Sequence, residues 1–202
     1  FWFRNNTHFE IIEQVVLPIL FQEINNRTKR KIRIWSAACA TGQEPYSLAI
    51  TILEYLRKLG ISSAYNLEII ASDIAQSAIK RAKNGEYDNI TIKRGLSSEF
   101  RDRYFIQDNS KWRINDKVKS MVKFQQLNLK DDISTLGKFD IVFIRNVIIY
   151  FGKEFKENLL DRITTILNPG GYLFMGAGET LFNLIVNYKI LEKDGIIYYQ
   201  KK

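Results

Sequence analysis

A loop of small residues follows the apolar run at residues 32–36, which has the length and composition of a buried strand. The loop reads Ala-Ala-Cys-Ala-Thr-Gly-Gln-Glu-Pro over residues 37–45, so its backbone can approach a ligand closely before a helix that we expect to start at Pro45. It lacks the Gly-x-Gly-x-x-Gly pattern that holds a pyrophosphate, which disfavours a dinucleotide. The carboxylate of Glu44 instead suits a ligand with a positive amino group. A tight strand-to-helix turn is the alternative that involves no ligand.

Polar side chains follow three further strand-like runs. Asp73 comes directly after one of them, where a carboxylate can accept both hydrogen bonds of a ribose diol, although it could instead cap the next helix. Asn128 and Asn146 stand at two later junctions, and an amide offers the donor and the acceptor that suit the edge of an adenine. Their neighbours Leu129 and Val147 could cover the faces of that ring. Isolated Asn residues at strand ends are also common turn formers, so both interpretations stay open.

These residues can meet only if the preceding strands lie in one sheet. Apolar runs alternate with amphipathic segments along the chain, which predicts right-handed crossovers onto a parallel sheet and a doubly wound α/β fold. In such a fold, ligands bind beyond the carboxyl ends of the strands, where the residues described above are expected. The expected strands cover residues 32–36, 67–72, 139–144 and 172–176, and the expected helices cover residues 46–59, 75–84 and 155–167.

The two ends of the chain add elements to this core. Apolar residues at helical spacing over residues 8–26 predict a helix that packs on one face and bends at Pro18. Two β-like pieces at residues 188–192 and 196–200 surround a Lys-Asp-Gly turn and predict a terminal antiparallel hairpin.

A segment in the middle of the chain breaks the alternation. Short β-like pieces at residues 111–114 and 121–125 flank a turn-prone Asn-Asp pair, which predicts a small antiparallel insertion at about residues 96–125. Basic residues recur over residues 93–123. Together with the net charge of +8, they make this insertion the better candidate for contact with an acidic partner.

Composition limits the class of protein. A chain of 202 residues with 46% hydrophobic content can bury one ordinary core, so we expect a single domain. Cys39 is the only cysteine, which excludes an intrachain disulfide and fits a reducing compartment. No apolar run approaches the length of a membrane span, and residues 1–25 do not have the pattern of a signal peptide. These observations predict a cytoplasmic protein that does not insert into a membrane.

Six short motifs lie in order along nearly the whole sequence. They are Phe-Trp-Phe-Arg at residues 1–4, Ile-Trp-Ser-Ala-Ala-Cys-Ala-Thr-Gly-Gln-Glu-Pro-Tyr-Ser at 34–47, Ser-Asp-Ile at 72–74, Asn-Leu at 128–129, Arg-Asn-Val-Ile-Ile-Tyr-Phe at 145–151 and Pro-Gly-Gly-Tyr-Leu-Phe at 169–174. Together they resemble the CheR-type chemotaxis methyltransferases, which methylate glutamate side chains of bacterial chemoreceptors. The second and fifth motifs are far more specific than any glycine pattern.

The resemblance implies a Rossmann-like class I methyltransferase that uses S-adenosylmethionine, releases S-adenosylhomocysteine and needs no metal. It places Arg4 and Tyr150 beside the reacting methyl group. A Gly-Glu-Tyr string at residues 85–87 also matches, and it leads into the part that the family uses as a β-subdomain to dock receptors. The implied cofactor contacts are Arg4, Ala37, Glu44, Asp73, Ile74, Asn128, Leu129, Asn146 and Val147.

The chemistry implied by the resemblance is an in-line displacement at a sulfonium methyl group. A glutamate carboxylate is already ionised at pH 7, so no general base is required, and we expect His8 to pack in or cap the first helix. Arg4 can hold a carboxylate through two parallel hydrogen bonds, and Tyr150 could orient the attacking oxygen. The partner would be the cytoplasmic domain of a chemoreceptor rather than a nucleic acid, with the enzyme acting as a monomer. The helical domain that normally precedes the first motif is expected to be absent from this chain.

Two other functions remain open on sequence grounds. A Rossmann methyltransferase could act on a small molecule or on nucleic acid, although the chain lacks the Asn/Asp-Pro-Pro-Tyr/Phe motif of amino-methylating enzymes. A degenerate member could bind S-adenosylmethionine in a signalling complex without turnover, although Arg4 and Tyr150 are both present.

Overall fold

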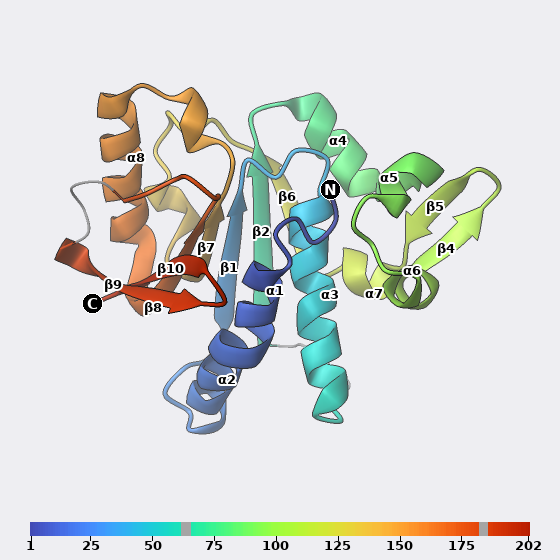
Figure 1. Cartoon of the computed structure of the whole chain (residues 1–202), viewed down its shortest axis with the longest axis horizontal. Helices are drawn as coiled ribbons and strands as arrows, with labels where there is room; N and C mark the ends of the chain where they lie inside the picture. The colour runs from blue at the N-terminus through green and yellow to red at the C-terminus, as the bar shows by residue number, and fades with distance from the viewer. Residues whose placement is uncertain (62–65, 182–185) are drawn as a thin grey trace.

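A seven-stranded sheet forms the centre of the computed structural model, which describes residues 1–61, 66–181 and 186–202 (Figure 1). Five strands run parallel, and the last two form an antiparallel hairpin on one edge. The predicted doubly wound α/β fold with a terminal hairpin is therefore confirmed. The strands, in their order across the sheet, are β6 (Val122–Gln126), β2 (Leu67–Asp73), β1 (Ile32–Ala37), β7 (Phe139–Ile144), β8 (Leu167–Met175), β10 (Ile196–Lys201) and β9 (Tyr188–Lys193).

Helices cover both faces of this sheet. Successive side chains of a strand point to opposite faces, so that Ile34 of β1 packs with one hydrophobic cluster and its neighbour Trp35 with the other. The first face carries α1 (Thr7–Ile11), α2 (Leu17–Asn25), α3 (Gln43–Lys58) and α4 (Gln76–Asn84), and the second carries α8 (Lys153–Ile166). None of the helices described is long and apolar enough to cross a membrane.

The N-terminal helical segment is irregular where a bend was predicted. A π-helical turn at Ile12–Val16 separates α1 from α2, and Pro18 lies in the first turn of α2. Proline has no backbone N–H to donate to the preceding turn, so the local hydrogen-bonding pattern changes just before it. The segment still buries one face against the sheet, including Ile11 and Leu17.

A separate three-stranded antiparallel sheet projects from the side of the molecule that carries α4 (Figure 1). It contains β3 (Glu86–Asp88), β5 (Lys111–Ile114) and β4 (Phe105–Asp108), in that order, with the short helices α5 (Asn89–Lys93), α6 (Ser98–Tyr104) and α7 (Asp116–Lys119) around it. We call it the small sheet.

The small sheet differs in two respects from the expected insertion at residues 96–125. It begins ten residues earlier, with β3, a piece too short to show an alternating pattern. The expected antiparallel piece at residues 121–125 is instead β6, which pairs in parallel with β2 at the edge of the central sheet. An isolated run of five residues does not reveal its partner strand, because register and direction are set by tertiary packing.

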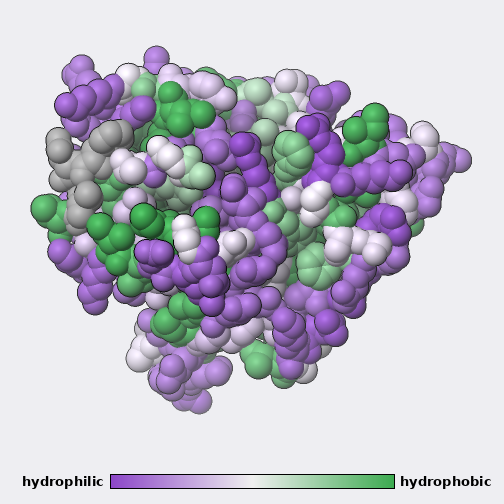
Figure 2. All heavy atoms as spheres, in the orientation of Figure 1, coloured by the Kyte–Doolittle hydropathy of each residue, from purple (hydrophilic) through white to green (hydrophobic). Residues whose placement is uncertain are grey.

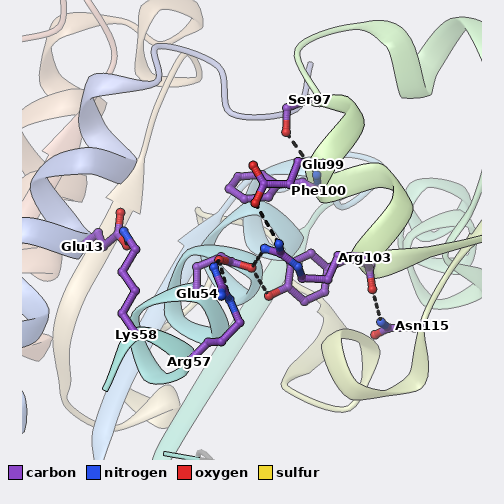
Figure 3. A network of polar contacts seen from close by, with 10 residues as sticks. Glu13, Glu54, Arg57, Lys58, Ser97, Glu99, Phe100, Arg103 and Asn115 are labelled. Atoms are coloured by element: carbon purple, nitrogen blue, oxygen red, sulfur yellow. Dashed lines mark hydrogen bonds and ion pairs between the residues drawn. The ribbon is translucent and has the colours of Figure 1, made fainter. Parts of the chain in front are cut away.

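A polar network joins the small sheet to the core (Figure 3). Glu54, in the middle of α3, accepts hydrogen bonds from Tyr104 at 2.6 Å, Arg57 at 2.7 Å and Arg103. Two of these donors belong to α6. The ring of Trp2 adds an apolar contact, since its centroid lies 5.1 Å from that of Phe105 on β4.

Candidate functional site

The four junctions singled out in the sequence lie side by side at one edge of the sheet. The strands that precede them, β6, β2, β1 and β7, are neighbours and run in the same direction. Their carboxyl ends therefore meet, and the helices that follow β1 and β7 go to opposite faces. Such a switch point opens a crevice in which α/β proteins bind ligands.

In the loop after β1, every second residue has a left-handed backbone conformation. Ala38, Ala40 and Gly42 have positive φ angles of 57°, 48° and 93°. The amide of Cys39 donates to the carbonyl oxygen of Ser72 at 2.9 Å, which ties the loop to the end of β2. A Cβ at Gly42 would lie 3.0 Å from the Cβ of Ala82 in α4, so only glycine fits there without strain.

Asp73 fastens two loops to each other. One carboxylate oxygen accepts the amide of Ala40 at 2.8 Å, and the other accepts the amide of Ala75, just before α4, at 2.9 Å. Asp73 does not cap α4 itself, since Ala75 is the N-cap residue and α4 has no side-chain cap, but it does hold the turn that leads into the helix. Because a carboxylate offers about four acceptor sites, two amide contacts leave capacity for the two hydroxyls of a ribose.

A cavity of about 310 Å³ opens beside Asp73. Six of the predicted residues line it, drawn from the ends of β2, β6 and β7, and most of its exposed lining is apolar. Tyr150 is 79% exposed and lies at its rim. The lining comprises Ala38, Asp73, Ile74, Leu127, Asn128, Leu129, Lys130, Val147, Tyr150 and Phe151.

Four predicted residues do not line this cavity. Ala37 is buried at the end of β1, with 1% of its surface exposed, so its side chain belongs to the core below the loop. Arg4, Glu44 and Asn146 belong instead to two polar clusters next to the cavity.

Asn128 forms a turn on the wall of the cavity. Its side-chain oxygen accepts the amide of Lys130 at 3.0 Å, so the amide nitrogen is the group that can donate to a ligand. Arg162 of α8 holds the same turn by donating to the carbonyl oxygens of Leu129 and Asp131, both at 2.6 Å. The turn-forming role is thus observed, and contact with an adenine stays a prediction.

Arg145 organises the first polar cluster. Its side chain is 1% exposed, and it donates to Glu44 at 3.1 Å, to the carbonyl oxygen of Arg4 at 2.6 Å and to the side-chain oxygen of Asn5 at 2.7 Å. The second oxygen of Glu44 accepts the hydroxyl of Ser36 at 2.8 Å. The N-terminal segment is therefore fastened next to the acidic residue of the β1 loop.

Burial opposes the ionisation of both charged side chains in this cluster, Glu44 and Arg145. Burial raises the pKa of Glu44, and Arg145 opposes that shift. Burial likewise lowers the pKa of Arg145, while Glu44 acts in the opposite direction. A further positive group placed at Glu44 would stabilise its ionised form. That Glu44 receives an amino group stays a prediction.

A second cluster surrounds Glu179, which sequence reasoning missed. Glu179 is 7% exposed and accepts the backbone amide of Asn146 at 2.9 Å. No signal in the sequence reveals it, because a glutamate three residues after a strand resembles a solvated turn. Arg145 was also missed, although it stands inside the fifth motif.

The side chains of His8 and Cys39 are both buried. His8 is 1% exposed, and burial together with the charge of Arg145 lowers its pKa to about 4, so it is neutral at pH 7. Burial raises the pKa of the Cys39 thiol. In the part of the chain that the structure describes, no group of three or more His, Cys, Asp or Glu side chains is arranged to hold a metal ion.

Comparison with known proteins decides the family. The family described as CheR methyltransferase, SAM binding domain, matches residues 1–196. The chain belongs to the CheR methyltransferase family. This CheR domain is thus an S-adenosylmethionine-dependent methyltransferase of the chemotaxis type.

Individual relatives agree with this assignment. The domain is 46% identical over 203 residues to chemotaxis protein methyltransferase 1 of Pseudomonas aeruginosa, covering 99% of this chain and 73% of that protein. It is 42% identical to chemotaxis protein methyltransferase Cher2 of Pseudomonas putida, covering 99% of this chain and 72% of that protein. Among solved structures, the DszA carbon methyltransferase is similar with a TM-score of 0.50 at 19% identity, covering 84% of this chain and 35% of that one, which supports the fold alone.

Proposed function

We propose that this CheR domain transfers the methyl group of S-adenosylmethionine to glutamate side chains of chemoreceptors, forming methyl esters. The observation that carries the proposal is the identity of 46% and 42%, over nearly the whole chain, to proteins named as chemotaxis methyltransferases. The chemistry is compatible with it, since the sole histidine, His8, is buried and does not line the cavity. A carboxylate is ionised at pH 7 and needs no base, unlike an amine or a hydroxyl. The relatives named as chemotaxis methyltransferases support the same substrate class.

The cofactor would occupy the cavity and extend toward the β1 loop. Asp73 would accept the ribose hydroxyls, and Asn128 would donate to the adenine while Leu129 and Val147 cover its faces. Ile74, which is 61% exposed at the cavity wall, would add apolar contact. The ammonium group would lie at the end of the site near Glu44, with Asn146 and the backbone of Ala37 close by.

Arg4 and Tyr150 would act on the substrate. Tyr150 stands at the cavity rim, where an incoming carboxylate must pass, and its hydroxyl can donate one hydrogen bond. Arg4 is exposed while its backbone is held by Arg145, so its guanidinium can reach a carboxylate from the N-terminal segment. Methyl transfer to a carboxylate requires alignment of the two reactants more than activation of the nucleophile. Loose contacts from Arg4 and Tyr150 can provide this alignment.

The partner would be the cytoplasmic, helical part of a chemoreceptor. The chain carries a net charge of +8, which favours approach to an acidic surface. Hydrophilic residues dominate the face of the molecule seen in Figure 2, including much of the region of the small sheet. In this proposal the described residues form one catalytic domain in the cytoplasm, and the small sheet serves as its receptor-docking part.

The decisive experiment follows a labelled methyl group. The protein is incubated with tritiated S-adenosylmethionine and receptor cytoplasmic fragments, and the label is tested for release by mild base. Base-labile label in the receptor is the expected result, because methyl esters hydrolyse readily. Base-stable label would indicate another methylated group, and cofactor binding without any transfer would indicate a non-catalytic signalling role.

Variants separate the roles of the residues. Arg4→Ala and Tyr150→Phe are expected to reduce turnover, since both side chains are proposed to lie beside the reacting methyl group. Asp73→Ala is expected to weaken cofactor binding by about tenfold or more, because it loses two hydrogen bonds to the ribose. Isothermal calorimetry that finds unchanged affinity for Asp73→Ala would refute the ribose assignment.

A further inference from the structure

The segment after β7 has little regular structure of its own. Asn146 has a positive φ of 58°, and the chain then enters a single 3-10 turn, Ile148–Tyr150. The backbone amides at the start of such a short turn have no partners within it, and an unpaired buried amide is costly. This segment nevertheless supplies Val147 and Tyr150 to the cavity. Some other group must hold it in place.

One carboxylate accepts four consecutive amides of this segment, those of residues 146–149. An oxygen of Glu179 accepts the amide of Asn146 at 2.9 Å. The other oxygen accepts the amides of Val147 at 3.2 Å, Ile148 at 3.1 Å and Ile149 at 3.3 Å. Hydrogen bonds to an ionised acceptor are stronger than neutral ones, so a single buried charge fixes four consecutive residues.

The strand next to β7 contributes to the same arrangement. The amide of Gly176, directly after β8, donates to Glu179 at 2.7 Å, and the amide of Glu179 returns a hydrogen bond to the carbonyl oxygen of Gly176 at 3.0 Å. A Cβ at Gly176 would stand 2.6 Å from the Glu179 carboxylate and 2.8 Å from the side-chain nitrogen of Asn146. A side chain at this position would therefore push the two residues apart.

We propose that Glu179 is a positioning residue that holds the backbone amides of residues 146–149 and thereby sets the side chains of Asn146 and Val147. It sets Tyr150 indirectly, because the amide of Tyr150 donates to the carbonyl oxygen of Val147 at 3.2 Å. Glu179 lines no part of the cavity described above, and it acts only through the residues that it holds. The inference rests on the proposed roles of Asn146, Val147 and Tyr150. Glu179 lies outside the sequence motifs described above, yet in this proposal it arranges the backbone of the fifth motif, residues 145–151.

A pair of matched variants tests the proposal. Glu179→Gln keeps the size of the side chain but removes its charge. It also replaces one acceptor oxygen with an NH₂ group, which cannot accept hydrogen bonds from the backbone N–H groups. We expect its Kd for S-adenosylmethionine to rise by about tenfold and its turnover to fall further, because several contacts shift together. Glu54→Gln is the control, since Glu54 is also a buried glutamate with several donors, but it lies at the small sheet. It should lower stability and leave the cofactor Kd unchanged.

Two outcomes would overturn the proposal. The first is wild-type Kd and turnover in Glu179→Gln. The second is a loss of affinity that Glu54→Gln reproduces at equal loss of stability, which would mean that both changes act through folding alone. Rescue of the wild-type Kd by Glu179→Asp is not expected, because the shorter side chain cannot reach amides on both sides.

A measurement on the unaltered protein covers the case in which Glu179→Gln does not fold. Hydrogen exchange of the amides of residues 146–149 should be as slow as that of β7, since all four are bound to a buried carboxylate. Fast exchange at these amides in the folded, cofactor-free protein would overturn the proposal. Neither exchange nor cofactor affinity requires a receptor, so both results stand apart from the test of glutamate methylation.

Discussion

Two glutamates on the same helix show how differently a buried charge can be used. Glu44 lies in the first turn of α3 and contacts Ser36 and Arg145, and Glu54 lies further along α3 at the small sheet. Burial raises the pKa of Glu44, against the effect of Arg145. Burial alone would also raise the pKa of Glu54, but hydrogen bonds from Arg57, Tyr104 and Arg103 outweigh it and lower the pKa.

The difference fits the proposed role of Glu44 in binding a ligand and the structural role of Glu54. Glu54 is surrounded by donors that belong to the protein, so its ionised form is already stabilised in the folded state. Glu44 has one charged donor, which also serves Arg4 and Asn5. If Glu44 binds a cationic ligand, as proposed, that ligand would supply part of the positive charge that stabilises the ionised carboxylate.

The largest expected effect concerns stability at Glu54. Glu54→Gln should lower the free energy of unfolding by about 2 kcal/mol, because the buried hydroxyl of Tyr104 and the guanidinium of Arg103 lose a charged acceptor. Urea unfolding followed by circular dichroism measures this. Glu44→Gln should cost less stability, since a glutamine oxygen can still accept the hydroxyl of Ser36, and Arg145 keeps its acceptors on Arg4 and Asn5. Equal losses in the two variants would remove the distinction.

The two variants should affect cofactor binding in the reverse order, with the larger effect in Glu44→Gln. Glu44→Gln should raise the Kd for S-adenosylmethionine by about tenfold, because the ammonium group loses its counter-charge. Glu54→Gln should leave the Kd unchanged, and isothermal calorimetry on both variants provides the comparison. An unchanged Kd in Glu44→Gln would mean that the amino group binds elsewhere.

The pH dependence should differ at the two sites. Ionised Glu44 favours a cationic ligand, so the affinity for S-adenosylmethionine should weaken as pH falls through the raised pKa of Glu44, and Glu44→Gln should flatten this profile. Glu54 has a lowered pKa, so its contribution to stability is complete above the ordinary value of 4.5 and is lost as pH falls below it. The stability gap between the wild type and Glu54→Gln should therefore narrow in acid. A constant gap down to pH 3 would contradict the assignment.

The smallest expected effect lies at the exposed side of the network. The side chain of Arg57 is 53% exposed, and it contacts only one oxygen of Glu54. Arg57→Ala should change the free energy of unfolding by less than about 1 kcal/mol, since exposed ion pairs contribute little. Thermal unfolding at low and high salt tests this, and a larger loss would indicate that Glu54 depends on this donor as much as on the α6 donors.

Much of the fold was predictable because local signals agreed with it. The alternation of strands and helices, the terminal hairpin and the irregularity near Pro18 all follow from residue spacing or backbone chemistry. The direction of β6 was not predictable, because five residues at a sheet edge carry no sign of their partner. The residues lining the cavity came from junctions and motifs that the sequence displays. Glu179 and Arg145 act on backbone atoms far away in the sequence, which leaves no local pattern.

The contact between Arg145 and the carbonyl oxygen of Arg4 spans 141 positions in the sequence. Arg145 directly follows β7, so this contact cannot form until that strand has been synthesised. During synthesis Arg4 is added to the chain long before Arg145, which donates to its carbonyl oxygen. A growing chain can therefore fix the backbone of Arg4, the residue proposed to act on the substrate, only after β7 and Arg145 have been made.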